Sequence, residues 1–389
     1  MDKGSVTALT LLDLSAAFDT IDHKILLHRL QSWFRITGST LDWVASYLSD
    51  RKQRIKINGI LSTNAHIPSG VPQGSVLGPL LFTLYTTPLS SKISEYSIQH
   101  QLYADDTQLY ISFSSSDSTE SMHKLQSCLA AVQTWMLMNR LELNPDKTEF
   151  LLIGHKKQRE KYLSLFPTRL MGVETNPASS ARNLGVIFDR DFNFRCHISQ
   201  VCRTCFYHMR DIQRIRKHLS LENAKTLAHA LVTSRLDYCN SLLFGVAERE
   251  ISKLQRVQNC LARIVTKSPP RTHSPYLLHK LHWLPVKFRI QFKINLLTFK
   301  ILTTSQPAYL HDMLSFSTSR RSERLNRGRL LSVPRTRSGV GARAFSSCAP
   351  LLWNGLPLLV RSASSIVSFK KQLKTYLFGL AYPRSHLAP

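Results

Sequence analysis

Three aspartates on short β-prone runs are the residues of this chain best suited to chemistry. Asp105 and Asp106 are adjacent and lie between two such runs, and Asp13 closes a third run that begins at Val6. Adjacent carboxylates repel each other, and a divalent cation between or above them relieves the repulsion. Three carboxylates on neighbouring strand ends are what two-Mg²⁺ phosphoryl transfer requires. One ion activates the attacking hydroxyl, and the other holds the triphosphate and the leaving oxygen.

The alternative for Asp105 and Asp106 is a solvated hairpin turn, because aspartate is common in turns and short motifs match by chance. The wider sequence must therefore supply elements that bring Asp13 beside them.

The pattern from residue 1 to residue 190 predicts an α+β fold, a sheet with helices packed on one face. The expected strands and hairpins are 6–13, a charged-edge hairpin that turns at Asn58-Gly59, a hairpin around Asp105, and strands at 150–153 and 184–188. The expected helices are 24–34, 41–48, 76–86 and 117–139, and a bend is expected at 70–74. After about residue 190 apolar residues recur at helical spacing.

Two further motifs accompany the acids. Leu12 to Asp19 reads LDLSAAFD, and Ser69 to Phe82 reads SGVPQGSVLGPLLF, between the two acid sites. The order acid, Pro-Gln-Gly, Tyr-Ala-Asp-Asp resembles the palm of reverse transcriptases, and the surrounding wording is similar to the LINE-type (non-LTR) retrotransposon branch. The resemblance extends through Asn144 to Phe150, Leu184 to Asp189 and the tail from Arg343 to Tyr376, so it covers nearly the whole chain.

This resemblance implies a polymerase palm followed by a basic, mostly helical thumb. It implies an RNA-directed DNA polymerase that adds deoxynucleoside triphosphates to the 3′-hydroxyl of a DNA primer on an RNA template. Asp13 and Asp105 match the metal ligands of two Mg²⁺ ions, Asp106 a supporting acid, and the carbonyl of Leu14 a further oxygen ligand. Mn²⁺ could replace Mg²⁺.

The resemblance also assigns nucleotide-binding positions, each with a structural alternative. Phe18 matches an aromatic gate that excludes a 2′-hydroxyl, or it is a core residue. Gln73, Gly74 and Tyr103 match contacts around the incoming nucleotide, where Gly74 permits an approach that a Cβ would block, or Pro-Gln-Gly is only a turn. Lys147 matches a lysine that assists pyrophosphate departure, or it is a solvated loop residue.

Two more acids, Asp19 and Asp22, lie near the first motif. We expect them to be helix N-terminal acids rather than metal ligands.

Charge is unevenly distributed along the chain. Residues 1–150 hold 12 Lys/Arg and 14 Asp/Glu, whereas residues 151–389 hold 39 and 11, within a total net charge of +26. This excess predicts a polyanionic partner, and a solubilising surface or a disordered basic tail is the alternative. We expect the helical region after residue 190 to bind a nucleic-acid duplex without reading its bases. The candidate nucleic-acid contacts are Arg214, Arg216, Lys217, Lys253, Arg256 and Arg263.

The seven cysteines are too few, too scattered and odd in number for a disulfide framework, which favours a reducing intracellular setting, nucleus or cytoplasm. No apolar run reaches the ~20 residues of a membrane helix. Cys202, Cys205 and His208 have the short spacing of a zinc site. Because Cys205 lies on an apolar helical stripe, we expect a core residue instead.

We expect a palm over residues 1–190, a thumb-like region over 191–312, an Arg/Ser-rich linker or loop over 313–345 and a C-terminal helical segment over 346–389. In the resembled polymerases, fingers strands and an endonuclease precede the first acid, and the sequence before Asp13 matches neither. We therefore expect little or no activity from this chain alone. The alternatives are a non-catalytic RNA- or DNA-binding remnant of a retroelement and a two-metal nuclease. The oligomeric state is not predicted.

Overall fold

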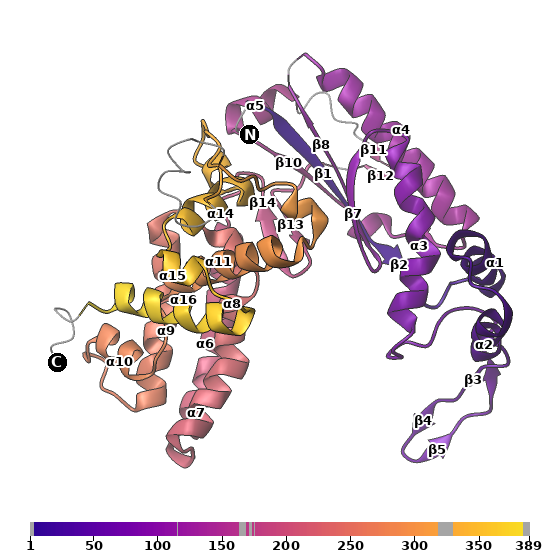
Figure 1. Cartoon of the computed structure of the whole chain (residues 1–389). Coiled ribbons are helices and arrows are strands. Elements are labelled where there is room, and N and C mark those ends of the chain that lie inside the picture. The colour runs from indigo at the N-terminus through magenta and orange to yellow at the C-terminus, as the bar shows by residue number, and fades with distance from the viewer. Residues whose placement is uncertain are drawn as a thin grey trace. The chain divides into compact units, whose positions relative to one another are not determined.

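The computed structural model describes residues 4–114, 116–162, 169–170, 173–174, 176–317 and 330–383. The chain divides into two compact units, Gly4–Ala181 and Arg182–Pro389, and each is described by itself (Figure 1).

The N-terminal unit is built on a four-stranded antiparallel sheet in the order β10-β1-β8-β7. Strand β1 lies inside the sheet and pairs with β8 along its whole length, from Val6 opposite Phe113 to Leu12 opposite Thr107. The strands are β1 (Val6–Leu12), β7 (Gln99–Tyr103), β8 (Asp106–Phe113) and β10 (Glu149–Ile153). Two short strands, β2 (Leu14–Ser15) and β9 (Glu142–Leu143), pair with each other just beyond the end of β1.

Helices α3 (Gly78–Ser94) and α4 (Ser118–Met138) pack on one face of this sheet and share its core. Alternate residues of β1, such as Val6 and Ala8, are buried in this core with Phe82 and Tyr85 of α3 and Leu125 of α4. The β-prone runs and the helical spacing of apolar residues are the sequence patterns from which the α+β fold was predicted. That prediction is confirmed.

Helices α1 (His23–Phe34) and α2 (Gly38–Leu48) precede α3. Asp22 caps α1, because its carboxylate accepts hydrogen bonds from the backbone N–H groups of Lys24 and Ile25 at 2.9 and 3.0 Å. The prediction that Asp22 is a helix N-terminal acid is confirmed.

Helix α3 runs eight residues past the predicted end at Thr86, although Pro88 lies inside it. The stripe of Leu81, Tyr85, Leu89 and Ile93 continues at i, i+4 spacing and is fully packed, so burial outweighs the hydrogen bond that proline removes.

An arm of two short ladders follows α2 (Figure 1). Strand β3 (Lys52–Gln53) pairs with β6 (Ala65–His66), and β4 (Lys56–Ile57) pairs with β5 (Ile60–Leu61) around the predicted Asn58-Gly59 turn. Ile57 and Ile60 are 67% and 77% exposed.

The C-terminal unit is mostly helical, with one small hairpin at its start, β13 (Ser180–Asn183) and β14 (Val186–Asp189). Its main core lies among α6, α9 and the first half of α11. The helices are α6 (Arg195–Ile215), α7 (Leu221–Ala228), α8 (Ser234–Asp237), α9 (Glu248–Thr266), α10 (Ser274–Lys280), α11 (Val286–Thr304), α12 (Ala308–His311), α14 (Phe345–Asn354), α15 (Leu358–Arg361) and α16 (Ile366–Ala381).

The C-terminal helices α14 to α16 form a second, smaller core with α11. Phe369 of α16 is fully buried and its ring stacks on Phe299 of α11 at 4.2 Å. The segment predicted over 346–389 therefore shares a core with the predicted 191–312 region. The middle of the predicted 313–345 linker, residues 318–329, lies outside the described residues.

Cys205 is fully buried in the main core of this unit, and burial raises the pKa of its thiol to about 12. Its expected role as a core residue is confirmed. Within the described part of the chain, every helix is too short or too polar to cross a bilayer.

Candidate active site

Strand register brings the three predicted acids to one end of the sheet. Leu12 is the last residue of β1 that pairs with β8, opposite Thr107. One further step in the same antiparallel register places Asp13 beside Asp106, the first residue of β8, at the short separation of paired strands. The backbone of Asp13 is also held from the other side, since the N–H of Asn144 donates to its carbonyl at 2.9 Å.

Asp105 lies in a two-residue turn between Tyr103 and Asp106, which pair with each other. The other turn residue, Ala104, has φ of +51°, a left-handed conformation that is unfavourable for a residue with a Cβ. Strained backbone of this kind clusters at functional sites. The tight turn keeps the carboxylate of Asp105 close enough to act on that of Asp106.

The carboxylates of this group influence one another. Partial burial, followed by the negative charges of Asp105 and Asp13, raises the pKa of Asp106. Lys147 Nζ lies 3.2 Å from Asp13 Oδ2, and this is an ion pair across two elements. Asp13 Oδ2 is inaccessible to solvent and has no hydrogen-bond partner among the described residues. The site therefore holds more negative charge than its neighbours neutralise.

The carboxylate oxygens of this site are of the type that Mg²⁺ prefers, but among the described residues they do not form a complete ligand set. Mg²⁺ prefers carboxylate oxygens and is often held by one or two carboxylates together with water and substrate phosphates. Among the described residues, no three acidic, histidine or cysteine side chains converge as a complete ligand set. A divalent ion held by these carboxylates would thus depend on substrate and water for its remaining ligands. Leu14, the predicted carbonyl ligand, lies in β2 opposite Leu143.

Phe18 stands on the loop after Asp13 and is half-buried. Its ring lies 4.7 Å from that of Phe82 on α3, and its carbonyl accepts from the N–H of Val71 at 2.8 Å. The position therefore joins the acid loop to the Pro-Gln-Gly segment. These contacts support a core role for Phe18, and they are compatible with its role as an aromatic gate that excludes a 2′-hydroxyl.

Gln73 is hydrogen-bonded to Asp19, which we expected to be a helix N-terminal acid. Its Nε2 donates to both carboxylate oxygens of Asp19 at 2.9 and 3.0 Å. Asp19 is not a helix N-terminal acid, because α1 begins only at His23 and is capped by Asp22. No local pattern could have linked positions 54 residues apart.

Gly70, rather than Gly74, is the glycine that a close approach requires. A Cβ at Gly70 would lie 2.8 Å from Asp19 Cα, whereas Gly74 has open space there and a φ of +78° that itself favours glycine. The Gly70 N–H donates to the carbonyl of Ile21 at 2.8 Å. The two motifs are thus packed backbone against backbone.

The six predicted nucleic-acid contacts of the C-terminal unit fall into two groups. Arg216 is 8% exposed, and its guanidinium donates to the carbonyls of Val265 and Leu219 at 2.6 to 3.1 Å. Arg263 donates to Ser274 Oγ at 2.6 Å and to the carbonyl of Thr272 at 3.3 Å. These bonds fit structural roles for both arginines rather than contacts with a nucleic acid.

The other four lie on the surface. Arg214 forms an ion pair with Asp211 at 3.4 Å and Lys253 one with Glu250 at 2.7 Å. Lys217 and Arg256 are exposed, with no ion-pair partner in the part of the chain that the structure describes.

The chain is similar in sequence to known polymerases. Residues 1–188 match the family described as reverse transcriptase (RNA-dependent DNA polymerase). The chain is 28% identical over 271 residues to a probable RNA-directed DNA polymerase from transposon BS of Drosophila melanogaster, and that match covers 66% of this chain. It is 26% identical over 278 residues to the RNA-directed DNA polymerase from mobile element jockey of Drosophila funebris, which covers 69% of this chain. The chain spans 29% of the length of each of these relatives.

Two solved telomerase structures were also found. Apo telomerase from Candida tropicalis matches with a TM-score of 0.34 and 13% identity over 47% of this chain and 34% of that one. Telomerase from Candida albicans matches with a TM-score of 0.33 and 14% identity over 74% of this chain and 48% of that one. The sequence matches carry the assignment: residues 1–188 match the reverse transcriptase family, and the similarity to the two transposon polymerases supports a LINE-type (non-LTR) reverse transcriptase.

Proposed function

We propose that this protein is an RNA-directed DNA polymerase that extends a DNA primer on an RNA template. The single observation that carries the proposal is the register of β1 and β8, which leads Asp13 to Asp106 and its neighbour Asp105. The pKa of Asp106 is raised by partial burial and then by the charges of Asp105 and Asp13, and a carboxylate perturbed in this way is typical of a functional site.

The proposed site uses Asp13, Asp105 and Asp106 to hold two Mg²⁺ ions, with Mn²⁺ as a possible substitute. When bound, the ions lower the barrier by activating the primer hydroxyl and by stabilising the leaving oxygen. The residues themselves position the reacting groups, which supplies much of the rate in phosphoryl transfer. The carbonyl of Leu14 is a further oxygen ligand in this proposal.

Lys147 has two roles in the proposed cycle. Before substrate binds, its ammonium is the counter-charge of Asp13, at 3.2 Å. Once an ion takes that place, the ammonium becomes available to the triphosphate, where it stabilises the charge that develops on pyrophosphate.

Phe18, Gln73, Gly74 and Tyr103 are the proposed nucleotide-binding residues. Phe18 lies against the sugar and excludes a 2′-hydroxyl. Gln73, oriented by Asp19, faces the incoming nucleotide. The exposed surface cations Lys217 and Arg256, with Arg214 and Lys253, grip the phosphate backbone of the template–primer. Because all seven cysteines are free thiols and the proposed substrates are intracellular, we place this activity in the nucleus or cytoplasm.

The test is extension of a primed RNA template by the full chain with Mg²⁺, alongside Mg²⁺-dependent binding of a deoxynucleoside triphosphate. Asp105→Asn keeps the size of the side chain and removes its charge, so it should abolish both readouts. Binding of template–primer should persist. Unchanged triphosphate binding in Asp105→Asn would refute the assignment even if extension by the wild type is weak.

A second candidate is a retroelement-derived protein that binds RNA or DNA without catalysis. The excess of cations after residue 150 favours it. It predicts salt-sensitive binding with no effect of Mg²⁺ on triphosphate affinity. A two-metal nuclease, the third possibility, would cleave template without added nucleotide and gives no role to Phe18 or Gln73.

A further inference from the structure

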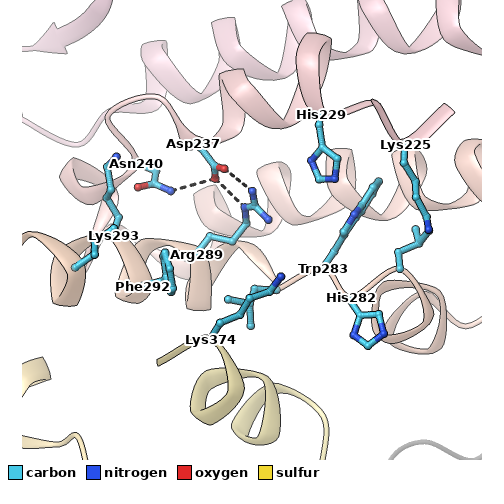
Figure 2. Close-up of a pocket in the computed structure, with 13 residues that line it drawn as sticks. Lys225, His229, Asp237, Asn240, His282, Trp283, Arg289, Phe292, Lys293 and Lys374 are labelled. Carbon is cyan, nitrogen blue, oxygen red and sulfur yellow. Dashed lines mark hydrogen bonds and ion pairs between the residues drawn. The ribbon is translucent and has the colours of Figure 1, made fainter. Parts of the chain in front are cut away.

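A cavity of about 450 Å³ lies within the C-terminal unit and does not include Asp13, Asp105 or Asp106 (Figure 2). Its volume is in the range of small-molecule sites. Elements distant in sequence line it, from α7 and α8 through the loop before α11 to α16. It is therefore a product of the tertiary fold rather than a local groove.

Cations dominate its polar lining. Lys225, Arg289, Lys293 and Lys374 line it with two histidines, His229 and His282, and Asp237 is its one acid. Lys225 is paired with Glu222 at 2.9 Å. Among the described residues neither Lys293 nor Lys374 has an ion-pair partner, so the cavity has an uncompensated positive charge that favours an anionic ligand.

Arg289 is held rigidly for such a ligand. Its Nε donates to Asp237 Oδ1 at 2.7 Å and its Nη2 to Oδ2, which is a side-on, two-bond pair (Figure 2). These bonds leave Nη1 with no partner among the described residues. A guanidinium fixed on one edge and open on the other is suited to a phosphate oxygen.

Apolar and aromatic side chains form the rest of the lining, including the half-buried Phe292 and Leu296 and the buried Trp283. Asn240, 3% exposed, also lines the cavity. Its Nδ2 donates to Asp237, whereas its Oδ1 is buried without a hydrogen-bond partner in the described part of the chain.

One wall of the cavity includes an irregular helix. Residues His229–Thr233 form a π-helical turn between α7 and α8. Such turns are rare and occur frequently at functional sites. Burial, and then the positive charge of Arg289, lower the pKa of His229, while the charge of Asp237 opposes them. Its ring adds an aromatic surface beside Trp283, 5.5 Å away.

We propose that this cavity binds a single nucleotide unit, with its phosphate on Arg289 and Lys374 and its base on the apolar lining near Phe292. Two sources share this chemistry, a free nucleotide and an unpaired nucleotide of a strand. The inference goes beyond the proposed polymerase site and does not depend on catalysis.

The test is calorimetric titration of the full chain with adenosine monophosphate, adenosine and inorganic phosphate. The nucleotide should bind at least about tenfold more tightly than either part alone, because both halves of the site contribute. The double variant Lys293→Ala/Lys374→Ala should weaken nucleotide binding at least about tenfold. The matched control Lys287→Ala/Lys371→Ala removes the same charge from the same two helices, α11 and α16, outside the cavity lining.

Equal affinity for inorganic phosphate and the nucleotide would overturn the proposal, since it would mean a simple anion site. So would equal loss in the control variant. Displacement of the nucleotide by a single-stranded 12-mer assigns the site to a strand, and lack of displacement assigns it to free nucleotide. Asp105→Asn should bind the nucleotide normally, so failure here and failure of the polymerase proposal are distinguishable.

Discussion

Three acids of the C-terminal unit and the three acids of the candidate active site differ in how their charge is balanced. In the C-terminal unit Asp237 pairs with Arg289, Glu222 with Lys225, and Glu250 with Lys253 at 2.7 Å. At the candidate active site Asp13 pairs with Lys147, whereas Asp105 and Asp106 have no ion pair among the described residues, and partial burial followed by the charges of Asp105 and Asp13 raises the pKa of Asp106. Paired acids stabilise a fold, whereas unpaired acids held together store repulsion that a cation can relieve.

A second comparison concerns arginines that donate hydrogen bonds inside each unit, the half-buried Arg29 and the buried Arg216. Arg29 donates to the carbonyl of Tyr85 and to Asn139, and Arg216 donates to the carbonyls of Val265 and Leu219. These side chains satisfy backbone acceptors inside the protein. The net charge therefore overstates the number of cations that can contact a polyanion. Only the cations that form no hydrogen bonds inside the protein are available for such contacts.

The largest effect that would sharpen this comparison is expected from Asp13→Ala. Extension should fall by about a thousandfold or more, because the ion and the primer hydroxyl lose their positioning. Affinity for template–primer should stay within about twofold, since the surface cations are unaffected. Asp42→Ala, at an exposed position on α2, is the control for charge removal. Loss of template–primer binding in Asp13→Ala would contradict the proposal that the acids serve catalysis and the surface cations serve binding.

Phe18→Ala should relax sugar discrimination by about a hundredfold, measured as the ratio of kcat/KM for deoxy- and ribonucleotides. The ring also packs on Phe82, so the melting temperature should fall as well. Phe18→Tyr keeps the ring and should retain the discrimination. A variant that loses stability but keeps the ratio would place Phe18 in the core only.

Neighbouring residues Arg216 and Lys217 should behave oppositely. Arg216→Ala leaves two buried carbonyls without their donor and should lower the free energy of unfolding by about 2–3 kcal/mol. Lys217→Ala should leave stability unchanged and reduce the salt dependence of nucleic-acid binding by about one charge. Urea unfolding and binding at several salt concentrations separate the two. Equal effects of both variants on the salt slope would return Arg216 to the binding surface.

The smallest effect is expected from Asp106→Asn without Mg²⁺. Because the pKa of Asp106 is raised in the folded state, its stabilising contribution is complete below the unfolded aspartate pKa of 3.8 and is lost as pH rises through the folded value. The asparagine variant should therefore be more stable than the wild type at neutral pH, by under about 1 kcal/mol, because the site is partly solvated. The difference should vanish at low pH and shrink when Mg²⁺ is added. A variant less stable than the wild type at neutral pH would contradict stored repulsion.

The sequence by itself determined the order of elements and the site that they build. The β-prone run of β1 and the hairpin around Asp105 are local patterns, and the sheet pairs these strands. Helical spacing likewise predicted the helices of the C-terminal unit. The end of α3 was missed because Pro88 is a local stop signal that packing overrides.

Only the tertiary structure decided which face of an element is covered and by what. Spacing shows that a helix has an apolar stripe, but not that α16 shares a core with α11 through Phe369 and Phe299. It shows that Arg216 is basic, but not that the chain returns with the Val265 carbonyl in reach. Gln73 and Asp19 meet for the same reason, across 54 residues. Local propensities act between near neighbours, whereas burial and hydrogen-bond partners are properties of the packed chain.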